Sequence, residues 1–201
     1  MTPEPPRPRL VLASASPARL RTLRAAGIEP DVVVSGVDES TVTGPPADVA
    51  LTLAVRKAMA VAAGQRDALV LGCDSVLELD GEAHGKPADA AEAVARWRRM
   101  RGRNGVLHTG HCLVDTTSGR RAADVASTVV HFADVTDEEV SAYVATGEPL
   151  HVAGAFTVDG LGGAFVERVE GDHHNVVGLS LPLLRRLLDD LGHRFVDLWS
   201  P

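Results

Sequence analysis

The chain has 201 residues and 45% hydrophobic content, which is enough to bury the core of a single domain. Its formal net charge of −7 argues against nucleic acid as the main partner. Two distant cysteines, Cys73 and Cys112, fit a reduced cytoplasm and support neither a disulfide framework nor a zinc knuckle.

Taken in chain order, the sequence begins with a Pro-rich flexible leader, residues 1–8, which has no apolar signal region. Residues 9–201 alternate short apolar runs with amphipathic ones, as is typical of one α/β domain. No apolar run approaches the length of a membrane span, so we expect a cytoplasmic protein with no membrane partner.

The elements of this domain can be placed from their patterns and caps. The expected strands are Arg9–Ala13, Asp31–Ser35, Ala68–Cys73, Val106–Val114, Ala123–Phe132, Ala155–Val158 and Ala164–Val169, with a hairpin over Val76–His84. The expected helices are Pro17–Ala26, Ala47–Ala63, Ala88–Met100, a helix capped by Thr136 that runs to Ala145, and Leu181–Leu191. Because helices alternate with hairpins, we expect a mixed, largely twisted sheet flanked by helices, with a substrate cleft at the strand ends.

Lysine is nearly absent from this chain. Of the 20 Lys and Arg residues only two are lysines, Lys57 and Lys86. Arg serves wherever a solvated cation suffices, so a retained Lys indicates a need for the compact point charge that suits phosphate oxygens. Lys57 should emerge beside the apolar face of its helix, and Lys86 lies in a Gly-Lys-Pro turn. Together they suggest an anionic ligand, although Lys57 could instead snorkel to water.

A second anion site is expected where the first strand passes into the first helix. Backbone N–H groups and the positive end of a helix meet at such a junction. Ser14 and Ser16 add hydroxyl donors there, and Arg19 follows in the first turn. The alternative is simpler: Ser16 only caps the helix and Arg19 is solvated.

Two acidic positions follow predicted strands. Asp74 comes directly after Ala68–Cys73, where it is a candidate general base or metal ligand, and Lys86 could return across the hairpin to face it. Asp38 and Glu39 follow the second strand, and one of them facing Asp74 could hold Mg²⁺ together with substrate phosphates. The alternatives are a turn cap for Asp74 and solvated loop acids for the pair.

Three further patterns indicate structure rather than chemistry. The histidine pairs His108/His111 and His173/His174 have no convincing companion ligands, so we expect no zinc site. Gly162-Gly163 is expected to be a turn. A basic run is expected to be a solvated helix face; it consists of Arg96, Arg98, Arg99, Arg101 and Arg103.

In their order along the chain, these motifs resemble those of the Maf family of nucleotide pyrophosphatases, from about Arg9 to the last helix. Each motif is short, and the ordered set is specific. The matching motifs are ASASPxR at 13–19, VDE at 37–39, LAxxKAxAVA at 53–62, GxDS at 72–75, GKP at 85–87, HTG at 108–110, GEP at 147–149, AGAF at 153–156, GLGG at 160–163 and NVVGL at 175–179.

The resemblance implies a hydrolase that cleaves nucleoside triphosphates between the α and β phosphates, releasing a nucleoside monophosphate and pyrophosphate. It also implies a divalent metal, Mg²⁺ or Mn²⁺, and a homodimer. By match, Asp74 is the proton acceptor, and Glu39 is one of the other polar active-site positions. The carboxylates at the strand ends make Asp74 and Glu39 the expected metal ligands. The expected phosphate-binding residues, from the resemblance and the anion sites together, are Ser14, Ser16, Arg19, Lys57 and Lys86.

The match departs from the dTTP/UTP branch of the family at positions tied to base selection. Ala18 stands where that branch has Arg, Ser75 where it has Thr, and Asp159 where it has Gln. A usual His is also replaced around Gly105. Base preference therefore stays open. Two other functions stay open as well: a phosphatase using the same anion site, and a non-enzymatic nucleotide-binding regulator of cell division.

Overall fold

The computed structural model describes residues 8–200, so the expected leader, apart from Pro8, lies outside the described residues. One seven-stranded sheet, in the order β2-β1-β3-β5-β6-β7 with β4 paired to β3, runs through this part of the chain. The strands are β1 Arg9–Leu12, β2 Asp31–Val32, β3 Ala68–Leu79, β4 Glu82–His84, β5 Asn104–Asp115, β6 Arg121–Phe132 and β7 Val166–Glu170. The pairs of β1 with β2 and β3 are parallel and the other pairs antiparallel, which confirms the mixed α/β sheet.

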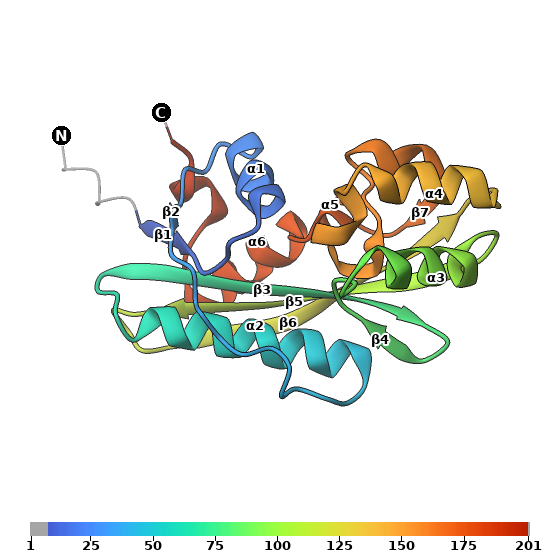
Figure 1. The fold of residues 1–201 in the computed structure, drawn as a ribbon. Coiled ribbons are helices and arrows are strands. Elements are labelled where there is room, and N and C mark those ends of the chain that lie inside the picture. The colour runs from blue at the N-terminus through green and yellow to red at the C-terminus, as the bar shows by residue number, and fades with distance from the viewer. Residues whose placement is uncertain (1–7, 201) are drawn as a thin grey trace.

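Helices lie on both faces of this sheet (Figure 1). The α-helices are α1 Pro17–Ala25, α2 Pro46–Ala62, α3 Ala90–Met100, α4 Asp137–Ala145, α5 His173–Val177 and α6 Leu181–Leu191. Short 3₁₀ helices span Glu148–His151, Ala153–Ala155, Leu161–Phe165 and Phe195–Leu198. α2 runs alone beneath β3 and β5, while α1 and α6 on one side and α3 and α4 on the other form two groups above the sheet.

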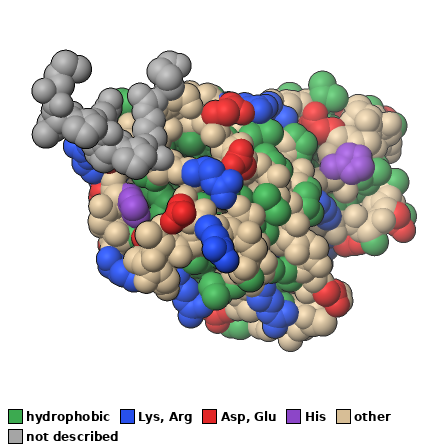
Figure 2. All heavy atoms as spheres, turned by 90° about the vertical axis from the view of Figure 1, so that its left-hand side faces the viewer, with side chains coloured by type: hydrophobic (Ala, Val, Ile, Leu, Met, Phe, Trp, Pro, Cys, Tyr) green, Lys and Arg blue, Asp and Glu red, His purple; other side chains and the backbone are tan. Residues whose placement is uncertain are grey.

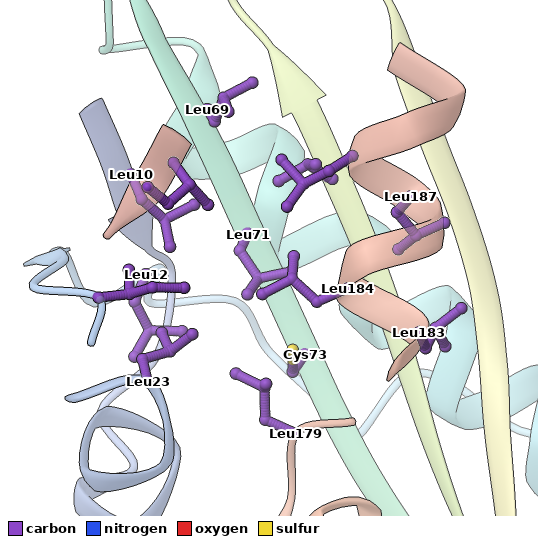
Figure 3. Packing of buried hydrophobic residues seen from close by; sticks show 14 of the residues in the cluster. Leu10, Leu12, Leu23, Leu69, Leu71, Cys73, Leu179, Leu183, Leu184 and Leu187 are labelled. Carbon is purple, nitrogen blue, oxygen red and sulfur yellow. The ribbon is translucent and has the colours of Figure 1, made fainter. Parts of the chain in front are cut away.

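The alternation of side chains along β3 divides the core. Leu69, Leu71 and Cys73 point toward α1 and α6, and Figure 3 shows them among the leucines of those helices. Val70 faces α2 instead, and Gly72 allows the helix to approach closely, because a Cβ there would lie 2.4 Å from the Ala54 carbonyl oxygen. A separate aromatic cluster around Trp97 fills the space below α3 and α4.

Two strand predictions differ from the structure. β3 does not end at Cys73 but continues unbroken to Leu79, since β5 pairs with it from Leu69 to Glu78. Asp74 therefore lies within a strand, not after one. The strand expected at Ala155–Val158 is absent: Gly154 and Ala155 have φ values of 73° and 61°, which are incompatible with extended backbone.

Smaller differences affect the edges of the sheet and the last third of the chain. β2 covers only Asp31–Val32 of the expected Asp31–Ser35, and β7 begins two residues later than expected. The five-residue helix α5 was not predicted. The Asp172 side chain caps it by accepting a hydrogen bond from the His174 N–H, and Gly178 ends it in the left-handed conformation.

Candidate active site

The sheet has a gap on one edge of β3. On that edge β1 pairs with Ala68–Leu71 and β4 with Leu77–Leu79, while β5 occupies the opposite edge throughout. Residues 72–76 consequently have no strand partner on the open edge within the described part of the chain; we call this interval the β3 gap. The carboxyl end of β1 borders it, which places the start of α1 beside Asp74 and Ser75. Ligands commonly bind where a strand departs in this way.

A buried lysine faces the carboxylate in the gap. Lys57 Nζ donates to Asp74 Oδ1 at 2.5 Å and lies 2.6 Å from Glu39 Oε1. The side chains of Lys57 and Asp74 are only 10% and 11% exposed, whereas that of Glu39 is 55% exposed. Lys57 thus emerges beside the apolar face of α2, as predicted, and its end meets two carboxylates rather than snorkelling to bulk water.

Burial changes the acidity of the central carboxyl. Desolvation raises the pKa of Asp74 above its ordinary value, and the positive charges of Lys57 and Arg19 oppose that rise. A carboxylate with a raised pKa accepts a proton more readily than a solvated one, which suits a general base.

Arg19 connects three separate segments at the gap. Its Nε donates to the Gly178 carbonyl oxygen at 2.7 Å, one terminal nitrogen to Ser14 Oγ at 3.1 Å and the other to Ser75 Oγ at 3.0 Å. The side chain is buried, so the alternative of a solvated Arg19 is wrong. Ser16 caps α1 by accepting a hydrogen bond from the Arg19 N–H, as the simpler interpretation expected.

Behind Ser75 lies a polar network that the sequence analysis did not assign. Ser75 Oγ is 2.9 Å from Thr109 Oγ1, and Thr109 donates to the Asn175 carbonyl oxygen at 3.2 Å. Asn175 Nδ2 in turn donates to Leu107 O and Thr128 Oγ1. In the sequence, Thr109 is marked only by the HTG motif and Asn175 only by the NVVGL motif. Nothing in the spacing of these motifs indicates that β5 and α5 meet.

Three of the predicted site residues lie apart from this centre. Lys86 is exposed and has no ion pair with a described residue, although its turn follows directly from β4, whose His84 pairs with Leu77. Ala18 is half-buried on α1, and Asp159 contacts the same helix through Arg21, with 3.4 Å between the charged groups. Ala18 and Arg21 are one turn apart, so two of the positions that differ from the dTTP/UTP branch lie on neighbouring surfaces.

The basic run on α3 divides into two kinds of residue. Its exposed members pair with surface acids, as Arg98 does with Asp137, which confirms a solvated charged face for them. Arg96 is an exception: it is buried, and counting it in the solvated face was wrong. Figure 2 shows a different face, on the side of the molecule away from α3, and there too basic and acidic side chains are interspersed rather than gathered by sign.

The histidine pairs differ in their surroundings. His108 lies between Glu78 and Ser127 at 2.8 Å from each, and buried His111 accepts a hydrogen bond from the Ser180 N–H. His173 and His174 do have a companion, since one ligand atom from each and one from Asp172 lie within 4.8 Å of one another.

Comparison with known proteins agrees with the motif pattern. The model of the Maf-like protein family matches residues 9–191. The chain belongs to this family. A Maf relative from Salinispora tropica, named nucleoside triphosphate pyrophosphatase, is 68% identical over 96% of this chain and 88% of its own length. Proteins of the same name from Streptomyces coelicolor and Nostoc punctiforme are 64% and 53% identical, covering 100% and 96% of this chain and 98% of each relative.

The carboxylates of this Maf protein fit a divalent cation. Lys57 occupies one oxygen of Asp74 and one of Glu39, and each carboxylate has a second oxygen left. Mg²⁺ is usually held by one or two carboxylates together with substrate phosphates, and Asp74 and Glu39 are donors of that kind. None of the helices in residues 8–200 combines the length and apolar character needed to span a bilayer.

Proposed function

We propose that this protein is a nucleoside triphosphate pyrophosphatase, which hydrolyses a nucleoside triphosphate to the monophosphate and pyrophosphate. The observation that carries the proposal is the buried Asp74 carboxylate facing Lys57 in the β3 gap, beside Arg19 and the N-terminus of α1. A base of raised pKa can activate a water molecule for attack on a phosphoric anhydride, and fixed cations beside it stabilise the charge on the phosphate oxygens. The name shared by its relatives supports the same activity.

In the proposed reaction, Asp74 takes a proton from a water molecule while the oxygen of that water forms a bond to the α-phosphorus. The bond from the α-phosphorus to the bridging oxygen breaks, and pyrophosphate leaves with the electron pair. Lys57, Lys86 and Arg19 offset the charge on the phosphate oxygens. Ser14, Ser16 and the first N–H groups of α1 add hydrogen-bond donors.

A divalent metal, Mg²⁺ or Mn²⁺, belongs to this proposal, with Asp74 and Glu39 as its protein ligands. When bound, it supplies Lewis-acid charge neutralisation at the phosphate oxygens. Lys57, which contacts both carboxylates, keeps them side by side and would limit their mutual repulsion in the absence of a cation.

The test is a panel of canonical and modified nucleoside triphosphates assayed for products with Mg²⁺ or Mn²⁺. Metal-dependent release of pyrophosphate and a monophosphate is expected. Release of orthophosphate would instead assign a phosphatase to the same anion site. Tight nucleotide binding without metal-dependent turnover would favour a regulatory binding protein linked to cell division.

The wider setting follows from the same proposal. Removal of non-standard nucleotides before their incorporation is the role we propose by analogy, in the cytoplasm and with no nucleic-acid partner. Light scattering in solution would test the expected homodimer. A role in base choice for Ala18, Ser75 and Asp159 is part of the proposal.

A further inference from the structure

Two side chains of helix α3 hold the turn that carries Lys86, one at each end of the turn. Arg96 donates to the Gly85 carbonyl oxygen at 2.5 Å, and the Ala88 N–H donates to Glu92 Oε2 at 2.7 Å. The two side chains are joined to each other, since Arg96 also donates to Glu92 Oε1 at 2.5 Å. One ion pair therefore closes a ring around the segment Gly85–Ala88, which we call the lysine turn.

This ion pair differs from the other arginine–carboxylate pairs of the structure. The Arg96 side chain is 4% exposed, whereas the exposed arginines of α3 pair with surface acids. Burying a guanidinium is unfavourable unless its donors are satisfied, and here a carboxylate and a backbone carbonyl satisfy them. The side chain of Glu92 is 46% exposed, so only the guanidinium end of this pair is buried. A buried guanidinium whose donors are directed at fixed acceptors restricts the backbone that it binds more than a surface arginine does.

The same turn is restrained from other directions. The Gly154 N–H donates to the Gly85 carbonyl oxygen as well, at 3.1 Å, and Pro87 fixes one backbone angle beside Lys86. Next along α3, Trp97 donates its indole N–H to the Ala155 carbonyl oxygen at 2.7 Å. α3 thus anchors both the lysine turn and the segment that packs against it.

Within this rigid backbone the Lys86 side chain itself has no such restraint. It is exposed and forms no ion pair with a described residue, so its ammonium remains available to an external anion. The lysine turn continues from β4, which borders the β3 gap. The anion that Lys86 would meet is therefore the substrate proposed for that gap.

We infer that Glu92 and Arg96 are positioning residues, which hold the lysine turn so that Lys86 meets the phosphates of a nucleoside triphosphate. The inference rests on the proposed function. It predicts that the pair acts only through Lys86, because within residues 8–200 neither side chain forms a hydrogen bond or ion pair with another residue assigned to the site.

The experiment is a double-mutant cycle in the full-length enzyme with its metal. Lys86→Ala and Arg96→Met should each lower kcat/KM by about 10- to 100-fold, the range expected when a positioned charge is lost or misplaced. In the Lys86→Ala background, Arg96→Met should lower kcat/KM no further. Arg98→Met, on the exposed side of the same helix, is the matched control and should behave as wild type.

Glu92→Gln provides a second test in case Arg96→Met fails to fold, because it keeps the size of the side chain and removes its charge. It should also lose its effect once Lys86 is replaced. An equal effect of either substitution with and without Lys86, or no effect of Lys86→Ala, would overturn the inference. Pyrophosphate release by the wild type is measured separately, so these outcomes leave the proposed function to its own test.

Discussion

Lys57 lies between two carboxylates, and its surroundings leave little free space. Its neighbours on α2 include the buried Leu53, Ala54 and Val61, and the backbone of β3 lies close to the helix at Gly72. Burial raises the pKa of Asp74, which lies opposite, and the cations around it offset only part of that rise. At the scale of single residues, then, the site depends on one small cation matched to one buried acid.

Asp74→Asn is expected to lower kcat by at least about 100-fold, the lower end of typical general-base contributions, because an amide cannot accept the proton. The amide oxygen can still accept the hydrogen bond from Lys57. Since burial raises the pKa of Asp74, its charge opposes folding at neutral pH, and the melting temperature should not fall. Asp190→Asn, on the exposed surface of α6, is the control. Turnover above a tenth of the wild-type value would show that Asp74 is not the base.

Lys57→Arg should also reduce turnover, although the charge is conserved. A planar guanidinium needs more room than an ammonium that already lies 2.5 Å from Asp74 and 2.6 Å from Glu39. Steady-state kinetics would measure the loss. The control is the opposite substitution at the neighbouring exposed residue, Arg56→Lys, which should leave turnover unchanged. Wild-type kinetics in Lys57→Arg would remove the argument drawn from the scarcity of lysine. The exposed position of Lys86 predicts a smaller effect for Lys86→Arg.

At the scale of elements, α1, which carries Arg19, and the segment around Asp159 approach each other. The contact is the exposed pair of Arg21 with Asp159, at 3.4 Å, which stabilises the fold little. The pair matters for the chemistry of Asp159, because one oxygen of its carboxylate accepts from Arg21 and an ionised carboxylate can only accept hydrogen bonds.

Asp159→Gln should therefore shift base preference toward UTP and dTTP. An acceptor favours bases that present donors, such as the N1–H and exocyclic amine of guanine, and disfavours the carbonyls of uracil and thymine. The measurement is the ratio of kcat/KM for UTP to that for GTP, in this variant and with Ala18→Arg added. A constant ratio at unchanged total activity would mean that Asp159 does not read the base.

The contact of α2 with the sheet depends on glycine at two strand positions. A Cβ at Gly110 would lie 2.3 Å from the Ala50 carbonyl oxygen, so Gly110→Ala must displace the helix backbone. Overpacking of this kind typically costs about 1–3 kcal/mol of unfolding free energy, and it should move Lys57 as well. Urea unfolding would measure the loss. Gly64→Ala, whose added Cβ would have 3.8 Å to its nearest neighbour, is the control and should be neutral.

Sequence patterns predicted the elements with long or well-capped signals. The helix expected to end at Ala145 begins at Asp137 with the capping box of Thr136 and Glu139. Lys57 could be placed because its helical neighbours are apolar. The five-residue α5 could not, since it is too short to display a helical period. The apolar run from Ala155 was misread as a strand because sequence does not reveal a positive φ at a non-glycine residue.

The residues whose surroundings the sequence did not predict have a common physical cause. Arg96 reads as solvated because it lies in a run of arginines, and only the tertiary position of the Gly85 carbonyl shows why it is buried. Thr109 and Asn175 are 66 residues apart, and no local pattern brings them together. Side chains that act through long-range backbone contacts leave no periodic signal in the sequence.

At the scale of the whole molecule, His111 links the sheet to α6. Its Nδ1 is 3.0 Å from the Thr109 carbonyl oxygen, and its Nε2 accepts a hydrogen bond from the Ser180 N–H at 2.9 Å. Nε2 can accept only when it carries no proton, so the structure requires neutral imidazole. Burial, with a smaller contribution from the charge of Arg19, lowers the pKa of His111 to about 4.

Acid should therefore destabilise the fold through this residue. The unfolded imidazole gains its proton near its ordinary pKa of about 6.5. The folded imidazole gains it only near 4, so the unfolded state binds more protons in between. The free energy of unfolding then falls by up to about 3 kcal/mol as the pH drops through this window. Urea unfolding at about pH 7 and about pH 4.5 should show a smaller loss for His111→Gln than for wild type. The exposed His151→Gln is the control, and equal losses in all three proteins would contradict the assignment.

β3 crosses beneath both groups of helices as one continuous strand, so residues 8–200 contain no break in the sheet that could act as a hinge between the groups (Figure 1). Its ladder with β5 holds ten residue pairs in register from Leu69 to Glu78. Rotating one group against the other would require breaking that ladder or bending it elastically along its length. Any movement that admits substrate is therefore expected in side chains and connecting segments, while the sheet stays rigid. Opening of the site should leave the amide protons of β5 slow to exchange with solvent.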